Sequence, residues 1–254
     1  MPNLETVQHS EDQPGSSLSL VKVFDAFGLI KDDIPVESWP DNTSLDAIKQ
    51  KITNPRIARA MGASPQTVNI VYGTELAANL LDSFSETGQR HFLAEADEVF
   101  QAAIALLPPN GRKLVLDLSR SAMTYFYFEA AIAQRIKSGD QFLDEEAIEY
   151  LLRRGADSTI YAAILQMDGI ASSGMIAGFR ARQALWDLRD DTEDLEQDRM
   201  TIGANVLLLS TRGSRQTLKR FATHLLEQGR FLDIPSPLRG AIEREYETTI
   251  AALK

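Results

Sequence analysis

The sequence predicts an all-α protein folded as a single-domain helical bundle. Helix start and stop signals recur along the chain, such as Ser64-Pro65, where serine suits the N-cap and proline the first helical position. Apolar residues between these signals follow helical spacing, and we find no internal repeat, hairpin signal or Gly-rich phosphate loop. A length of 254 residues fits one domain with one core.

The expected elements follow in chain order. Residues 1–17 are polar and are expected to form a disordered tail, so the domain is expected to span 18–254. Pro55 is expected to interrupt a helical pattern, and the segment 114–118 (LVLDL) alternates like a strand and stays ambiguous. We expect helices over 18–30, 44–52, 64–86, 88–107, 113–137, 144–154, 159–172, 176–198, 205–209, 216–228 and 236–253.

Composition excludes several kinds of function. The chain has no cysteine, which removes disulfides, thiolate metal sites and cysteine nucleophiles, and its three histidines are scattered. A formal net charge of −10 disfavours a surface built for nucleic acid. No stretch is long and apolar enough for a membrane span, and the N-terminus lacks the pattern of a signal peptide. We therefore expect a cytoplasmic protein.

Negative charge is concentrated between Asp187 and Asp198. This stretch holds seven acidic residues and one basic residue, Arg189. A solvated helix face would normally place basic side chains among the acidic ones to relieve their repulsion. The arrangement therefore predicts that other positive charge, with divalent cations as the first candidates, neutralises the segment.

Two sets of carboxylates recur at helical spacing. Asp190, Asp194 and Asp198 are spaced i, i+4, i+8, which places them on one face of a helix. Asp82 and Glu86 repeat the i, i+4 spacing on another expected helix. Mg²⁺ prefers oxygen ligands and is commonly held by one or two carboxylates together with substrate phosphates. The pattern therefore predicts a diphosphate joined to the protein through magnesium ions.

These residues resemble the class I isoprenoid synthase superfamily, particularly the trans-prenyl diphosphate synthases. Residues 183–198 (QALWDLRDDTEDLEQD) are similar to the second aspartate-rich motif of that family, Q-x-x-D-D-x-x-D. Residues 75–86 (ELAANLLDSFSE) are similar to its first motif, E-L-x-x-x-x-L-x-D-D-x-x-D. The part with Arg189, Asp190 and Asp194 also resembles the L-R-D-x-x-x-D of phytoene and squalene synthases. Both families share one helical fold, which the resemblance implies here.

The resemblance implies an enzyme that ionises an allylic prenyl diphosphate with Mg²⁺ as cofactor, and it allows a homodimer. Small residues upstream of Asp82 would leave room for a long prenyl chain, and aromatic side chains would line an apolar cavity. The implied catalytic residues are Asp82, Asp190 and Arg189. The implied metal ligands are Asp82, Glu86, Asp190, Asp191, Asp194 and Asp198. The implied substrate-binding residues are Arg153, Arg154, Ala78 and Phe84, with Ala77, Tyr125, Phe126, Tyr127, Phe128 and Trp186 as further candidates for the cavity wall.

Departures from the family pattern leave the reaction open. Ser83 replaces the second aspartate of the first motif, and no R-R-G follows it at 89–91. The lysine of a K-T motif is absent near 157–159, so the half of the site that would accept isopentenyl diphosphate looks eroded. This pattern suits an unusual prenyltransferase, and it equally suits a terpene cyclase. A non-catalytic subunit of a prenyl synthase is a further alternative.

A helix-turn-helix pattern at 57–68 favours a different class, a DNA-binding protein. Ala58, Gly62 and Val68 stand at the offsets where that motif needs close helix contact, a turn and a packed second helix. The second helix, 66–75, has no Lys or Arg to contact phosphates or guanine. Nucleic-acid binding is therefore the less favoured reading.

Overall fold

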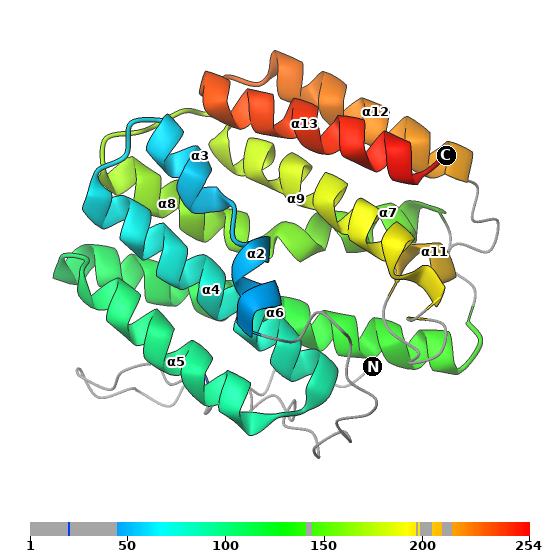
Figure 1. Ribbon diagram of the computed structural model, residues 1–254, viewed down its shortest axis with the longest axis horizontal. Helices are drawn as coiled ribbons and strands as arrows, with labels where there is room; N and C mark the ends of the chain where they lie inside the picture. Colours follow the sequence, from blue (N-terminus) through cyan, green and yellow to red (C-terminus); the bar gives the residue numbers. More distant parts are fainter. Residues whose placement is uncertain (1–19, 21–44, 141–143, 197, 199–204, 210–214) are drawn as a thin grey trace, which may run out of the picture.

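A computed structural model describes residues 20, 45–140, 144–196, 198, 205–209 and 215–254 (Figure 1). These residues form helices and contain no strand, which confirms the all-α class. The expected tail at 1–17 and all of the expected helix at 18–30 except Leu20 lie outside them. The helices are α2 (Leu45–Lys51), α3 (Asn54–Ala60), α4 (Pro65–Thr87), α5 (Arg90–Ala105), α6 (Pro109–Lys137), α7 (Asp144–Arg154), α8 (Ser158–Met167), α9 (Met175–Glu193), α11 (Val206–Leu209), α12 (Arg215–Phe231) and α13 (Ser236–Ala252), with a 3₁₀ turn, η4 (Gly155–Asp157), between α7 and α8.

The ends of α4 follow directly from its sequence. The Ser64 side chain accepts a hydrogen bond from the backbone N–H of Thr67 at 3.2 Å, as expected for an N-cap. Gly88 ends the helix with a φ of +72°, in the left-handed region that glycine adopts without strain. At Gly73 a β-carbon would lie 2.6 Å from the β-carbon of Ala103, so this glycine lets α5 pack closely on α4.

Several expected boundaries differ from the structure, and the helix expected to reach Ser172 ends at Met167. Pro55 lies in the first turn of α3 and does not interrupt the helix. Proline has no backbone N–H, but an N–H in the first turn of a helix has no partner within the helix, so none is lost there. For the same reason α6 can begin at Pro109. The segment 114–118, which was ambiguous between helix and strand, lies inside α6 and is helical. The helix expected to reach Asp198 ends at Glu193, so Asp198 lies beyond α9.

One hydrophobic core joins the helices and includes residues from Leu20 to Leu253. Helix α4 packs against α2, α3, α5 and α8, while α9 packs against α7, α8, α12 and α13. Figure 1 shows α12 and α13 along one edge of the molecule and α5 along the opposite edge, with α4, α6, α8 and α9 between them. The middle helices therefore provide the walls of any interior site. In the described part of the chain, no helix has the length and apolarity needed to cross a membrane.

Helices α3 and α4 form the helix-turn-helix pair that the sequence predicts. Gly62 in the turn has a φ of +87°, and Ala58 and Val68 are buried between the two helices. Helix α4 is covered by α5 and α8, and its 23 residues include no Lys or Arg. In this fold the motif therefore describes how two helices of the bundle pack.

Candidate functional site

The central helices α4, α6, α8 and α9 enclose a cavity of about 160 Å³. Much of its wall is apolar and small or aromatic. Charged side chains lie at two places along this wall. One is near Asp82 and the other near Glu75, which are about two turns apart on α4. The apolar lining includes Ala77, Ala78, Leu81, Phe100, Phe126 and Trp186.

The first charged region contains Asp82 of α4 and faces the acidic segment of α9. Burial raises the pKa of Asp82, and the charge of Asp190 raises it further. The positive charges of Lys51 and Arg154 lower it. The carboxylates of Asp82 and Asp190 are therefore close enough for the charge of one to act on the other. One residue of each predicted acidic motif lies in this region.

Arg154 of α7 lies in the same region, between the two motifs. Its Nη1 donates a hydrogen bond to Oδ1 of Asp191 at 2.7 Å, and its Nε lies 3.5 Å from Oδ2 of Asp187. The Arg154 side chain is 15 % exposed, so this guanidinium is largely removed from bulk water. Arg154 is the predicted substrate-binding arginine that lines the cavity.

Asp187 is a site residue that the motif comparison missed. Burial raises its pKa to about 8, although Arg154 lowers it. Its Oδ1 accepts a hydrogen bond from the Gln183 amide at 3.0 Å, but its buried Oδ2 has no hydrogen-bond partner. Its position one turn before Asp191 was the available signal, because both residues then project from the same side of α9.

A half-buried carboxyl on α6, that of Glu129, adds to this region, and no sequence pattern singled it out. Oε1 of Glu129 accepts hydrogen bonds from the hydroxyls of Tyr125 at 2.6 Å and Tyr150 at 3.3 Å. Burial and the nearby charge of Asp82 raise the pKa of Glu129. Tyr125 lines the cavity, so this group fixes the orientation of one aromatic side chain in the wall.

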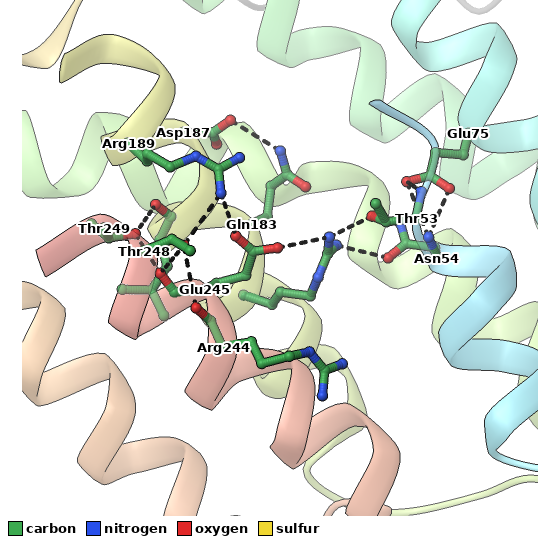
Figure 2. A network of polar contacts seen from close by, with 12 residues as sticks. Thr53, Asn54, Glu75, Gln183, Asp187, Arg189, Arg244, Glu245, Thr248 and Thr249 are labelled. Atoms are coloured by element: carbon green, nitrogen blue, oxygen red, sulfur yellow. Dashed lines mark hydrogen bonds and ion pairs between the residues drawn. The ribbon is translucent and has the colours of Figure 1, made fainter. Parts of the chain in front are cut away.

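The second charged region contains Glu75, also on α4. Oε2 of Glu75 accepts a hydrogen bond from the N–H of Asn54 at 2.9 Å, and Oε1 accepts from the N–H of Thr53 at 3.1 Å (Figure 2). Arg182 of α9 donates to Oδ1 of Asn54 at 2.9 Å and also bonds to Thr53 Oγ1. Burial raises the pKa of Glu75 to about 7 despite the nearby Arg182.

Two further polar residues complete this second region. The Tyr161 hydroxyl donates a hydrogen bond to Oδ2 of Asp157 at 2.8 Å, and both residues line the cavity. Burial raises the pKa of Asp157. The cavity therefore has polar groups at two places and an apolar wall between them.

Two of the predicted arginines point elsewhere. Nη1 of Arg189 lies 3.0 Å from Oε2 of Glu245 on α13 (Figure 2). Its guanidinium covers the Trp186 ring at 4.2 Å. Arg153 is exposed, pairs with Glu149 and stacks on the Phe128 ring at 4.5 Å. The prediction that Arg189 and Arg153 serve the same site as Arg154 is therefore corrected: helix packing turns them towards other partners.

The predicted cavity residues divide in a similar way. Ala77, Ala78, Tyr125, Phe126 and Trp186 line the cavity. Phe84, predicted to bind substrate, is buried in the hydrophobic core at 1 % exposure, because the other side of α4 faces that core. Phe128 lies under Arg153 instead, and the side chain of Tyr127 lies outside the described part of the structure.

The predicted metal ligands do not share one helical face. Asp191 bonds Arg154 and accepts from the N–H of Val206 at 2.7 Å, so the fold itself uses its carboxylate. Asp198 accepts from the Asn205 amide at 2.7 Å. Asp194 caps the end of α9, where burial and the charges of Asp190 and Asp198 raise its pKa. The side chain of Glu86 lies outside the described part.

These carboxylates fit a particular kind of magnesium site. Among the described residues no group of three or more acidic or histidine side chains is placed to hold a metal ion by itself. Asp82 lies on α4 and Asp190 and Asp194 at the end of α9, and the charge of Asp190 raises the pKa of both Asp82 and Asp194. Such donors suit a Mg²⁺ ion that a phosphate helps to hold.

Comparisons of the chain with protein-family models, with curated proteins and with solved structures found no match. The resemblance to isoprenoid synthases therefore stays a prediction based on the motif residues. The geometry adds an independent observation, because Asp82, Asp187 and Arg154 line one region of the cavity and the charge of Asp190 lies close to Asp82.

Proposed function

We propose that this protein is a Mg²⁺-dependent prenyltransferase that ionises an allylic prenyl diphosphate. The observation that carries the proposal is that Asp82 and Arg154 line one region of the cavity, with the charge of Asp190 close to Asp82 and apolar side chains in the wall beside them. Carboxylates alone would repel a diphosphate, whereas carboxylates beside a cation and a buried guanidinium match its charge. An apolar cavity next to them suits the prenyl chain.

Each residue has a defined part in this function. Asp82, Asp190 and Asp194 would hold Mg²⁺, and Arg154 would donate hydrogen bonds to oxygens of the diphosphate. When bound, Mg²⁺ supplies positive charge near the oxygen that departs. Asp187 and Asp191 keep Arg154 in place while the carbon–oxygen bond breaks, so the guanidinium needs no rearrangement as negative charge develops.

The apolar wall has a second part, to protect the allylic cation. Trp186 and Phe126 present aromatic surface to the cavity, and aromatic faces attract cations. The same wall favours a second candidate function, a class I terpene cyclase, because an enclosed aromatic cavity also suits a cation that reacts with its own chain. Both candidates share the ionisation step and differ in what captures the cation.

The test is release of inorganic pyrophosphate from geranyl, farnesyl and geranylgeranyl diphosphates, with Mg²⁺ or with EDTA. We expect release only with Mg²⁺, and at least a tenfold loss in Asp82→Asn and Asp190→Asn. Asp117→Asn is the matched control, because Asp117 is an exposed carboxylate that pairs with Arg120 on its own helix. Product analysis with and without isopentenyl diphosphate separates transferase from cyclase. Release that is equal in EDTA would contradict the proposal.

A further inference from the structure

Helix α4 presents two carboxylates to the same cavity. Glu75 and Asp82 are seven residues apart, which is ~10 Å along a helix and close to two full turns. Ala78 lies between them on the same side and also lines the cavity. A diphosphate held near Asp82 would therefore place its reacting carbon between the two carboxylates.

The surroundings of Glu75 carry more acid than base. Arg182 of α9 is the cation near it, Asp157 of η4 adds a second carboxyl, and Tyr161 of α8 faces both. The N–H groups of Thr53 and Asn54 at the start of α3 complete the set of groups around it. The buried region therefore suits a group that gives up a proton or carries positive charge.

A capping role for α3 does not by itself account for Glu75. Helix starts are usually capped by the side chain of the N-cap residue, and Thr53 is of a suitable type. Here the Thr53 side chain makes no capping bond and instead bonds Arg182. The carboxylate that takes its place comes from another helix and lines the cavity, where an ionisable group costs desolvation energy.

We propose that Glu75 is a catalytic base that takes the proton released by the allylic cation, an inference that rests on the proposed ionisation. The carbon–oxygen bond breaks first, and its electron pair leaves with the diphosphate. A C–H bond next to the cation then breaks, its electrons form a new carbon–carbon double bond, and the proton goes to Oε of Glu75. Without this base the cation is captured by water and gives an alcohol.

The position of Glu75 gives this step a pH dependence. A base must be ionised to accept a proton, and burial raises the pKa of Glu75 to about 7 although Arg182 lowers it. Asp157 raises it further, while the N–H groups of Thr53 and Asn54 lower it. The ratio of hydrocarbon to alcohol should therefore rise with pH through about 7.

The experiment compares wild type with Glu75→Gln, using Mg²⁺ and farnesyl diphosphate. Pyrophosphate release and the ratio of hydrocarbon to alcohol are measured separately. We expect release within about threefold of wild type, because the ionising region lies two turns away, and at least a tenfold fall in the ratio. Asp168→Asn is the matched control, since Asp168 also accepts from a backbone N–H, that of Ser64 at 2.6 Å, in another part of the fold. It should change neither quantity.

The outcomes separate this inference from the proposed function. An unchanged product ratio in Glu75→Gln would overturn the role of Glu75 and leave the ionisation intact. Absence of pyrophosphate release by wild type would overturn both. If Glu75→Gln does not fold, the pH profile of wild type decides: a ratio that rises through about pH 7 supports the base, and a flat ratio overturns it.

Discussion

The guanidinium of Arg154 on α7 lies 2.7 Å from the carboxylate of Asp191 on α9, and both side chains are largely buried. The contact joins the basic end of one helix to the acidic segment of another. Part of the negative charge that the sequence concentrates between Asp187 and Asp198 is therefore balanced inside the protein.

Replacing Arg154 should strongly destabilise the protein. Arg154→Gln leaves Asp187 and Asp191 buried without their cation, and removing one partner of a buried pair costs about 3–5 kcal/mol. Urea unfolding followed by circular dichroism measures this loss. Arg153→Gln is the control: its ion pair with Glu149 is exposed and should contribute less than about 1 kcal/mol. Equal effects of the two variants would contradict the assigned role of Arg154.

Asp194→Asn should separate stability from function. In the metal-free protein its carboxylate is disfavoured by burial and by the charges of Asp190 and Asp198, so the variant should melt at the same or a higher temperature. Wild type should gain more stability from Mg²⁺ plus a prenyl diphosphate, and turnover of the variant should fall at least tenfold, about 1.4 kcal/mol. Glu193→Gln, at an exposed neighbouring position, should change neither quantity. If the metal-free Asp194→Asn variant is less stable than wild type, Asp194 instead has a structural role.

The stability of the protein should fall as pH rises through the range in which Glu75 titrates. Burial raises the pKa of Glu75 from 4.5 to about 7, so the folded protein binds more protons than the unfolded chain between these values. The contribution of Glu75 is fully present below pH 4.5 and is lost as pH rises through about 7. The free energy of unfolding should be measured at several pH values between about 4.5 and 7. Its fall over this range should be about 3 kcal/mol smaller in Glu75→Gln than in wild type. The exposed Glu149→Gln should keep the wild-type slope.

Ala78→Phe should restrict the length of the substrate chain. Ala78 lines the cavity on α4 between Glu75 and Asp82, so a larger side chain reduces the space for a prenyl group. We expect kcat/KM for the twenty-carbon diphosphate to fall at least tenfold relative to the ten-carbon one. Ala102→Phe, on the exposed face of α5, should leave this ratio unchanged. A parallel loss for all chain lengths would contradict the assigned position.

The sequence determined most of the helices, because their signals are local, although it did not predict α3. Ser64 and Pro65 begin α4 and Gly88 ends it, within two residues of where capping preferences and helical spacing place its ends. The proximity of Asp82 to Asp190 was also expected, because both belong to acidic patterns at helical spacing on different helices. The all-α class therefore followed from local sequence patterns.

Tertiary structure decided which similar side chains reach the site. Arg153, Arg154 and Arg189 are equivalent as residue types, and only the packing of α7 and α9 directs Arg154 towards the cavity. Asp191 likewise resembles its acidic neighbours in sequence. In the structure its carboxylate accepts hydrogen bonds from the backbone N–H of Val206 and from the guanidinium of Arg154. These partners are 15 and 37 residues away along the chain. Local patterns fix the helices, whereas the direction of a side chain depends on contacts between helices, which local patterns do not contain.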